Sequence, residues 1–491
     1  MSKSKRDVDH AFFGQPRGLA TLAFTEFWER FSYYGMRAIL LYYMIASLEH
    51  GGLAMNAVLA ASIVSIYGSL VYMSSVLGGF VADRLWGGHR TVFVGGIFIM
   101  FGHIALAVPA GVPALIIAII LIVIGTGMLK PNISEMVGGL YGKDDMRRDS
   151  GFSLLVMGIN LGSFLSPIIV GWLGQEVNYH LGFSIAAFGM FIGLIIYIID
   201  GNKYLNKEDF QAPDPIQPDE LRPLLWKVAG LIAVLVIILV AMGVTGTLTG
   251  DGVVNLITMI AILIPIWYFV TIIRSKKVTK IERSRVISYI PLFIAAVFFW
   301  AIEEQGSTVL ALFAQNQTQL TLGSFHIPAS WFQSLNPLFI VVYTPFFAWL
   351  WVHMGKKQPS SPKKYVYGLI FAGLSYFAMM IPVGLFGTSA RVSPLWLVLS
   401  WAIVEIAEML ISPVGLSVTT KLAPKAFKSQ MMSMWFLADS AAQAINAQVV
   451  KLYTVQTEFW YFAGIGIASV VLAVLLLFIT PRVERLMAGV N

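Results

Sequence analysis

Long apolar segments alternate with short polar segments along almost the entire chain. Each apolar segment reaches about 20 residues, the length that an α-helix needs to cross the hydrocarbon core of a bilayer. The segments are continuous, whereas the strands of a membrane barrel would alternate in pieces of about ten residues, so we expect helices. The pattern predicts fourteen spans, at residues 18–46, 57–82, 91–109, 113–140, 152–174, 181–200, 224–246, 253–273, 287–315, 330–353, 365–386, 394–420, 429–451 and 458–480.

The positions of the basic side chains predict the orientation of these spans. If the amino terminus is inside, nearly all of the 33 Lys and Arg residues fall in predicted inside segments, beginning with Lys3, Lys5 and Arg6. The predicted outside loops hold only Arg391, with Lys451 at a helix end. Because cytoplasmic loops carry the excess of basic residues, we expect a multi-pass protein of the plasma membrane with both termini in the cytoplasm.

The composition supports a membrane protein and excludes several kinds of site. Hydrophobic residues make up 57% of the chain and charged residues only 12%, against about 25% charged in soluble domains. The absence of cysteine rules out disulfides, thiolate metal sites and thiol nucleophiles, and the seven histidines show no close pairing. We therefore expect no metal, no cofactor and no enzyme activity. The basic residues are divided among short segments, so a nucleic-acid surface is not expected either.

Two polar segments divide the predicted spans into groups. Residues 201–223 are polar and Pro-rich, as in a linker, and residues 273–285 are strongly basic. Leaving out the two nearly uncharged helices between them gives six spans before and six after, which is typical of transporters with two pseudo-symmetric halves. We predict an amino-terminal six-helix bundle (1–200), a cytoplasmic linker (201–223), an inserted two-helix hairpin with a basic linker (224–285) and a carboxyl-terminal six-helix bundle (286–491).

The first predicted span contains ionisable residues, although a charge at the bilayer centre costs about 2.5 kcal/mol or more. Glu26 and Arg30 are four residues apart and therefore lie on one helix face, with Glu29 beside them. Two acids and one base leave one carboxylate without an equal partner, and such a group can bind and release a proton. The alternative is a static polar patch that fixes helix packing.

Two further polar residues lie within the spans of the first half. Lys130 is deep in its span, next to Pro131, which bends the helix. It is either a site residue or a lysine whose long side chain extends to the membrane surface. Asn160 lies in the following span, where an asparagine more often makes an interhelical hydrogen bond than it binds a ligand.

The second half contributes acids instead of bases. Its predicted spans contain Glu303, Glu304, Glu405, Glu408 and Asp439, and no Lys or Arg lies in the interior of these helices. Cations in one half and anions in the other are expected to meet across a central cavity, because isolated buried charges are costly. A short peptide has an ammonium group at one end and a carboxylate at the other, and therefore fits this polarity.

Three motifs together carry a family resemblance: Glu26-x-x-Glu29-Arg30-Phe31-x-Tyr33-Tyr34-Gly35, Lys130-Pro131-Asn132, and Phe152…Ile159-Asn160-x-Gly162-Ser163. They resemble the proton-coupled oligopeptide transporter family of the major facilitator superfamily. A weaker similarity, to the superfamily's loop between helices two and three, is Gly79-x-x-x-Asp83-Arg84 with Arg90. The resemblance covers the whole chain. It implies an all-α membrane protein with the major facilitator fold of six plus six helices, and two inserted helices that make fourteen in total.

The resemblance also implies a role for each matching residue. Proton coupling would involve Glu26, Glu29 and Arg30, with Glu303 as a second candidate. The backbone and termini of the peptide would contact Arg37, Lys130, Asn160, Asn336 and Glu408. Its side chains would enter pockets lined by Tyr33, Tyr34, Tyr72, Trp300 and Trp435. Arg37 with Glu304 would close an outer gate, and Lys130 with Glu408 an inner one. Asp439 stands where a small hydroxyl residue is expected; it could shift peptide preference, add a protonation site, or do neither.

The resulting hypothesis is a proton-driven symporter, expected to be a monomer, that imports di- and tripeptides across the plasma membrane by alternating access. A second hypothesis keeps the fold and changes the cargo to another small solute, such as nitrate or a peptide-like drug. The complete motif of the first span and a carboxylate opposite Lys130 favour a zwitterion over an anion. A third, a membrane enzyme or receptor, is disfavoured because the loops are short and no nucleophile triad or phosphate loop occurs.

Overall fold

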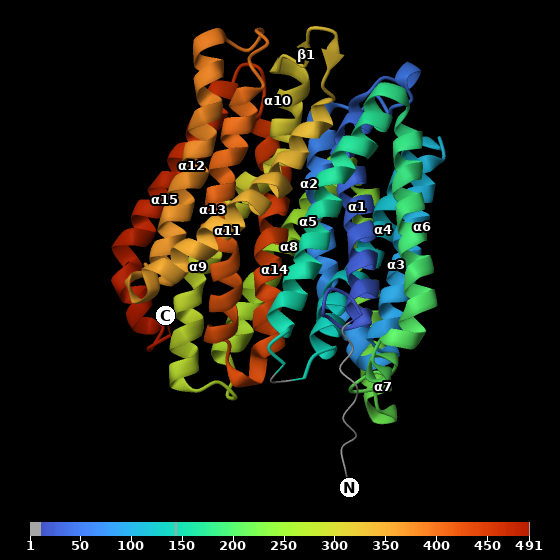
Figure 1. The fold of residues 1–491 in the computed structure, drawn as a ribbon, viewed down its shortest axis with the longest axis vertical. Coiled ribbons are helices and arrows are strands. Elements are labelled where there is room, and N and C mark those ends of the chain that lie inside the picture. The colour runs from blue at the N-terminus through green and yellow to red at the C-terminus, as the bar shows by residue number, and fades with distance from the viewer. Residues whose placement is uncertain (1–10, 143–144, 491) are drawn as a thin grey trace. The chain divides into compact units, whose positions relative to one another are not determined.

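The computed structural model describes residues 11–142 and 145–490 (Figure 1). Lys3, Lys5 and Arg6, which contribute to the predicted orientation, lie outside these residues. Twelve helices of the described residues are long and apolar enough to cross a membrane. Two more long helices, which contain the charged and polar residues around Arg30 and Asp439, bring the total to the fourteen predicted spans. The predicted all-α membrane architecture is therefore confirmed.

The long helices follow the predicted spans closely. In chain order they are α1 (Arg17–Ile45), α2 (Ala57–Val81), α3 (Gly88–Ala107), α4 (Gly111–Gly139), α5 (Arg148–Trp172), α6 (Tyr179–Tyr204), α7 (Pro218–Val244), α8 (Gly250–Arg274), α9 (Lys280–Glu303) with α10 (Val309–Gln317), α11 (Leu335–Met354), α12 (Ser361–Phe386), α13 (Leu395–Leu422), α14 (Lys428–Val449) and α15 (Glu458–Leu486). A short antiparallel hairpin, β1 (Thr321–Leu322) and β2 (Phe325–His326), lies between α10 and α11 and was not predicted.

The helices form two compact units by their contacts, and each unit is described separately. Unit 1 comprises the described residues of Met1–Tyr34, Ser74–Ser163 and Phe183–Leu256, and unit 2 comprises those of Gly35–Met73, Phe164–Gly182 and Ile257–Asn491. Helices α1, α2, α5, α6 and α8 therefore contribute residues to both units. The two units are defined by the contacts of a single conformation, and their bounds differ from those of the predicted bundles. The predicted division into two six-helix bundles therefore remains a prediction.

The core of unit 1 is formed by α1, α3, α4, α5 and α6. Leu19, Ile99 and Leu129 are among its fully buried side chains. Helices α3 and α4 approach closely at Gly95 and Gly125, where a Cβ on Gly95 would lie only 2.7 Å from the Gly125 carbonyl oxygen. Small residues permit this close backbone approach, and tight packing is a main source of helix association in a membrane.

In unit 2, polar contacts fasten the end of α1 and the start of α2 to later helices. The Tyr42 hydroxyl donates to the carbonyl oxygen of Ala311 in α10 at 3.0 Å. The Ser62 hydroxyl donates to the carbonyl oxygen of Ala447 in α14 at 2.8 Å. Because such groups are buried away from water, each satisfied hydrogen bond helps to hold these helix ends together.

The segment predicted as a linker is docked on unit 1. Arg84, which follows α2 in the π-helical turn η2 (Ala82–Trp86), forms ion pairs with Asp214 and Glu220. The backbone N–H of Asp214 donates to the carbonyl oxygen of Asp83 at 3.1 Å, and that of Ile216 donates to the carbonyl oxygen of Arg84 at 3.1 Å. Arg84, one of the two arginines of the weak superfamily motif, therefore anchors the chain at the start of α7.

Carboxylates gather where this linker meets η2 and α4. Asp83, Glu135 and Asp209 line one cavity of about 480 Å³. Asp209 lies in the 3₁₀ turn η4 (Lys207–Phe210), and burial, together with the negative charges of Glu135 and Glu208, raises its pKa from 3.8 to about 6. The carboxyl therefore holds its proton more tightly in the docked linker than in a free one. The contribution of Asp209 to docking is fully present below pH 3.8 and is lost as pH rises through about 6.

We predict that docking weakens as pH rises through about 6, since the ionised Asp209 carboxylate is then disfavoured. The measurement is hydrogen exchange at the amides of Asp214 and Ile216, corrected for intrinsic rates between pH 5 and 7.5. Asp209→Asn should reduce the pH dependence and raise protection at pH 7.5, while Asp83 and Glu135, which line the same cavity, keep their carboxyl groups. Glu208→Gln, which removes an exposed neighbouring charge, should cause a smaller change in the same direction. Unchanged pH dependence in Asp209→Asn would contradict this account.

Candidate functional site

Helix α1 carries a buried ionic group within unit 1. The Arg30 Nε atom donates to the Glu29 carboxylate and lies 3.4 Å from Glu26 Oε1. All three side chains are buried, and Glu29 is 0% exposed. The Arg30 guanidinium also lies over the Tyr33 ring, 5.1 Å from its centroid. The predicted common face of Glu26 and Arg30 is confirmed, and one guanidinium is shared by two carboxylates.

Arg37 lies further along α1, in unit 2, and pairs with Glu304. Its Nη2 atom donates to the Glu304 carboxylate and also to the Ser307 hydroxyl at 2.9 Å. Arg37 is 8% exposed and Glu304 is 7% exposed, so the ion pair is largely removed from water. The two residues predicted to close an outer gate are therefore in contact, and their gating role remains a proposal.

A break in the helix directs two consecutive acids to different partners. Helix α9 ends at Glu303, and the 3₁₀ turn η5 (Glu304–Ser307) precedes α10. Neighbouring residues in a helix point about 100° apart, so the two carboxylates diverge. Glu304 contacts Arg37, whereas Glu303 accepts a hydrogen bond from Asn336 at 2.8 Å.

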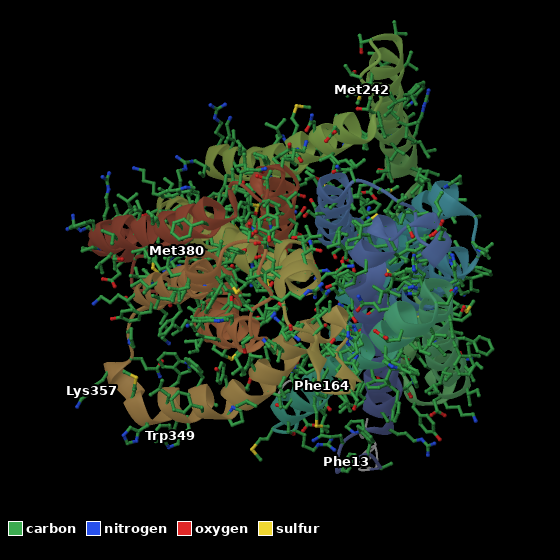
Figure 2. All side chains as sticks on the ribbon, turned by 90° about the horizontal axis from the view of Figure 1, so that it is seen from above. Phe13, Phe164, Met242, Trp349, Lys357 and Met380 are labelled. Atoms are coloured by element: carbon green, nitrogen blue, oxygen red, sulfur yellow. The ribbon has the colours of Figure 1, made fainter. Side chains whose placement is uncertain are left out.

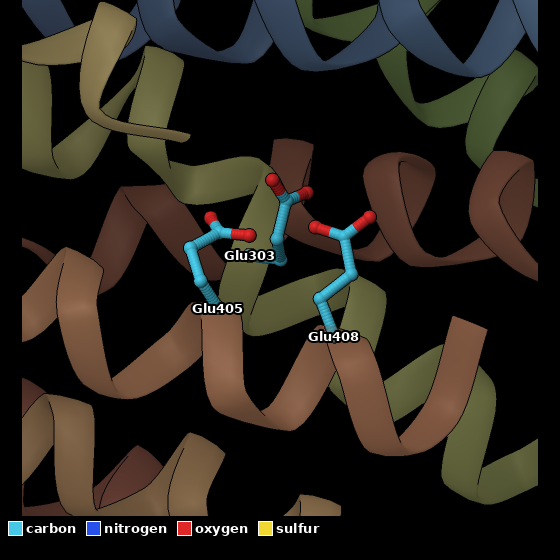
Figure 3. A group of neighbouring side chains, drawn as sticks. All are labelled: Glu303, Glu405 and Glu408. Atoms are coloured by element: carbon cyan, nitrogen blue, oxygen red, sulfur yellow. The ribbon is translucent and has the colours of Figure 1, made fainter. Parts of the chain in front are cut away.

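Glu303, Glu405 and Glu408 form a carboxylate cluster in unit 2 (Figure 3). One carboxylate oxygen of each lies within 4.8 Å of the others, and Glu405 and Glu408 are three residues apart on one face of α13. The Asn336 Nδ2 atom, at the start of α11, donates to Glu303 Oε1 and to Glu405 Oε1, both at 2.8 Å. Like charges this close repel one another, so the cluster favours a positively charged partner: a proton, an ammonium group or a metal ion.

Two predicted pocket residues lie edge to face in unit 2. The ring centroids of Trp300 and Trp435 are 6.1 Å apart, with an interplanar angle of 66°. Asp439, one turn after Trp435, is 2% exposed, and its Oδ1 atom accepts a hydrogen bond from Gln443 Nε2 at 2.9 Å. In this structure the additional carboxylate therefore contacts its own helix, α14.

The remaining predicted residues are distributed over both units. Lys130 in α4 is close enough to Glu26 to interact with it electrostatically, and both belong to unit 1. The Asn160 side chain donates to the carbonyl oxygen of Val156 in its own helix at 2.9 Å. Tyr72 is half-buried in unit 2. Lys130 and Glu408 belong to different units, and the inner gate that they are expected to form remains a prediction.

Sequence reasoning did not assign two residues that the structure brings into these contacts. Glu405 was recognised as an acid of the second half without a role, although its spacing of three from Glu408 indicates a shared helix face. Ser307 is the second acceptor of the Arg37 guanidinium. No sequence pattern indicates this contact, because the position of Ser307 depends on the helix break after Glu303.

Comparisons with known proteins agree on one family. A sequence profile described as "PTR2: POT family" matches residues 89–467. The chain is 54% identical to the "Uncharacterized transporter YclF" of Bacillus subtilis over 98% of this chain and 96% of that protein. It is 49% identical to a "Di-/tripeptide transporter" of Lactococcus lactis subsp. cremoris over 99% of both. The crystal structure of a peptide transporter POT in complex with sulfate superposes with a TM-score of 0.95 at 53% identity, covering 98% of this chain and 97% of that chain. The expected major facilitator fold is thereby confirmed.

The buried ion pair between Arg37 and Glu304 generates a stability prediction. Removing one partner, in Arg37→Met or Glu304→Gln, leaves an uncompensated polar group or charge and should cost about 3–5 kcal/mol. The double variant should lose much less than the sum of the two single variants, because neither charge is then left alone. Thermal unfolding in one fixed detergent measures this, with Glu49→Gln, an exposed position, as the control. Additive losses would show that the pair does not couple.

Proposed function

Because this chain is a peptide transporter that belongs to the POT family, we propose that it is a proton-driven symporter that imports di- and tripeptides across the plasma membrane by alternating access. Both termini are placed in the cytoplasm, as the distribution of basic residues predicts. The observation that carries the proposal is the carboxylate cluster of Glu303, Glu405 and Glu408, held by Asn336 in the same compact unit as the Arg37–Glu304 pair.

The carboxylate cluster supports recognition of the peptide's amino terminus. An ammonium group brings the positive charge that three neighbouring carboxylates favour, and it has N–H donors for them. Asn336 already uses its amide N–H groups on Glu303 and Glu405, so its contribution is to fix the acids, and its carbonyl oxygen is the atom suited to a peptide N–H. This refines the predicted role of Asn336.

Arg37 and Lys130 are the proposed partners of the peptide's carboxylate. Arg37 is held by Glu304 and Ser307, and a guanidinium can bind a carboxylate through two parallel hydrogen bonds once it leaves its acid partner. Lys130 interacts electrostatically with Glu26. A proton that neutralises Glu26 therefore weakens the attraction between the two side chains. Proton binding and peptide binding are thereby linked through the same cations.

Proton coupling is assigned to Glu26, Glu29 and Arg30, with Glu303 as the second proton site. Arg30 contacts both acids of α1, so adding a proton to either one shifts the guanidinium toward the other and changes the contacts of this helix. One proton moving down 100 mV and one pH unit releases about 3.7 kcal/mol. That free energy corresponds to an accumulation of about 500-fold.

Alternating access is supported by the polar contacts within unit 2. The predicted topology places the end of α1 and the start of α2 outside. Tyr42 contacts α10, Ser62 contacts α14, and Arg37 pairs with Glu304 in the turn η5. We propose that these contacts close the outer side and that they break when the transporter opens outward. The paired binding of a peptide's two ends favours closure around the substrate.

Reconstituted protein should take up a labelled dipeptide against its gradient when the outside is acidic. Glu29→Gln should abolish this concentrative uptake and spare counterflow exchange, because the carboxylate that takes the proton is lost while the binding site is kept. Both are measured in liposomes with imposed pH gradients, with unlabelled di- and tripeptides and nitrate as competitors.

The matched control for Glu29→Gln is Glu458→Gln, another buried acid. Glu458 accepts hydrogen bonds from Gln317 and Tyr453, outside the carboxylate cluster, and its variant should keep concentrative uptake. Uptake by the unmodified protein that ignores pH and potential would reject proton coupling. Competition by nitrate in place of peptides would reject the peptide cargo.

We further predict that Glu408→Gln weakens uptake of peptides with a free amino group by about 10–150-fold, the range expected for a charged hydrogen bond of about 1.5–3 kcal/mol. Glu405→Gln should have a smaller effect, because Glu405 is 0% exposed and its replacement can still accept from Asn336. Amino-terminally acetylated peptides, which lack the ammonium charge, should show little difference between the variants. The comparison is made by competition for labelled dipeptide uptake.

A further inference from the structure

Two cavities of unit 2 adjoin each other where α11, α12 and α13 approach their predicted cytoplasmic ends. One has a volume of about 480 Å³ and is lined largely by polar residues. The other has a volume of about 410 Å³ and has only apolar surface. Trp351 and Pro359 line both cavities, so the two share a wall. In Figure 2, the labelled Trp349 and Lys357 mark this end of α11 at the lower left edge of the view.

The polar cavity presents two lysines. Lys364, in the first turn of α12, lies with its Nζ atom 3.9 Å from the centroid of the Trp351 ring and donates to Gln358 Oε1 at 2.9 Å. Gln358 in turn donates to the carbonyl oxygen of Trp351 at 2.7 Å, so the Lys364 side chain is held in place. Lys421, in the last turn of α13, lines the same cavity and is close enough to repel Lys364.

An anion in this cavity would relieve the repulsion between the two lysines. Ser361 and Ser417 also line the cavity and offer hydroxyl donors. The cavity lies at the amino-terminal end of α12, where backbone N–H groups and the helix dipole favour negative charge. The hydroxyl of Ser360 already donates to Glu484 and is not counted among the donors.

The apolar cavity is suited to a hydrocarbon chain. Its walls are aromatic and aliphatic, including Phe346, Phe347, Leu350, Phe371 and Leu410. Helix α11 is a peripheral helix, since only 11% of its most apolar stretch is buried. The cavity is therefore next to the bilayer, and it begins at the same Trp351 wall at which the polar cavity ends.

We infer that these adjoining cavities form a binding site for an anionic glycerophospholipid of the cytoplasmic leaflet. The phosphate headgroup lies between Lys364 and Lys421, and an acyl chain lies along the aromatic wall of α11. The two lysines at the membrane boundary favour a lipid with net negative charge over a zwitterionic lipid, whose net charge is zero. The apolar cavity favours a lipid over free phosphate, because phosphate has no hydrocarbon chain to bury there.

The test uses the full-length protein purified in detergent and supplied with phosphatidylglycerol or phosphatidylcholine. Native mass spectrometry counts retained lipid, and thermal unfolding measures stabilisation. Phosphatidylglycerol should be retained preferentially and should raise the unfolding temperature. Lys364→Gln with Lys421→Gln should weaken its retention by about 10-fold or more, and Leu350→Trp, which fills the apolar cavity, should also reduce it.

Lys363→Gln is the matched control, because Lys363 is the exposed neighbour of Lys364 and does not line the cavity. It should retain lipid as the unmodified protein does. Lys421→Gln alone changes an exposed side chain, so it should fold and still show part of the loss. Equal retention of both lipids, full retention by the double lysine variant, or the same stabilisation by inorganic phosphate alone would each overturn the inference.

Discussion

Burial of charge in a medium of low dielectric constant is the constraint on which this structure depends. An ion that leaves water must find a partner of opposite sign or must be neutralised by a proton. Arg30 lies between Glu26 and Glu29, and Arg37 contacts Glu304, so every buried guanidinium of α1 has an acid beside it. These contacts stabilise one arrangement of helices, and they are also contacts that a proton or a second ion can replace.

At the end of α9, two neighbouring acids have different partners. Glu303 and Glu304 are adjacent in the sequence, yet one joins the carboxylate cluster and the other joins Arg37. Glu303 is the last residue of α9 and directly precedes the turn that positions Glu304. In the proposed mechanism, the site for the peptide's ammonium group and the outer gate therefore involve adjacent residues of the chain.

The sequence predicts the helices well because membrane spans are determined locally. Length and apolar content locate each span, and lipid allows few alternatives to a helix. Even α1, with Glu26, Glu29 and Arg30 at its centre, is recognisable from its flanks. The short hairpin of β1 and β2 was missed because two residues on each strand leave too little pattern.

The site was only partly predictable, since its contacts join residues that are far apart in the chain. The spacing of Glu26 and Arg30 predicts their contact, because both lie on one helix. Arg37 and Glu304 are 267 positions apart, and no periodicity indicates that they meet. Their pairing was expected only through the family resemblance, and Ser307 was not expected at all because the turn after Glu303 is a tertiary feature.

In the proposed mechanism, the carboxylate cluster contains more acids than the ammonium group that it binds has charges. Glu303, Glu405 and Glu408 must tolerate two states, one with substrate and one without. When an ammonium group is present, the acids have a cation; when it leaves, their mutual repulsion grows unless a proton takes its place. Asn336 keeps Glu303 and Glu405 in position in either case, because an amide N–H group donates to an ionised carboxylate and to the carbonyl oxygen of a protonated one. Under this proposal, the exchange of a proton for an ammonium group therefore requires little rearrangement of the cluster.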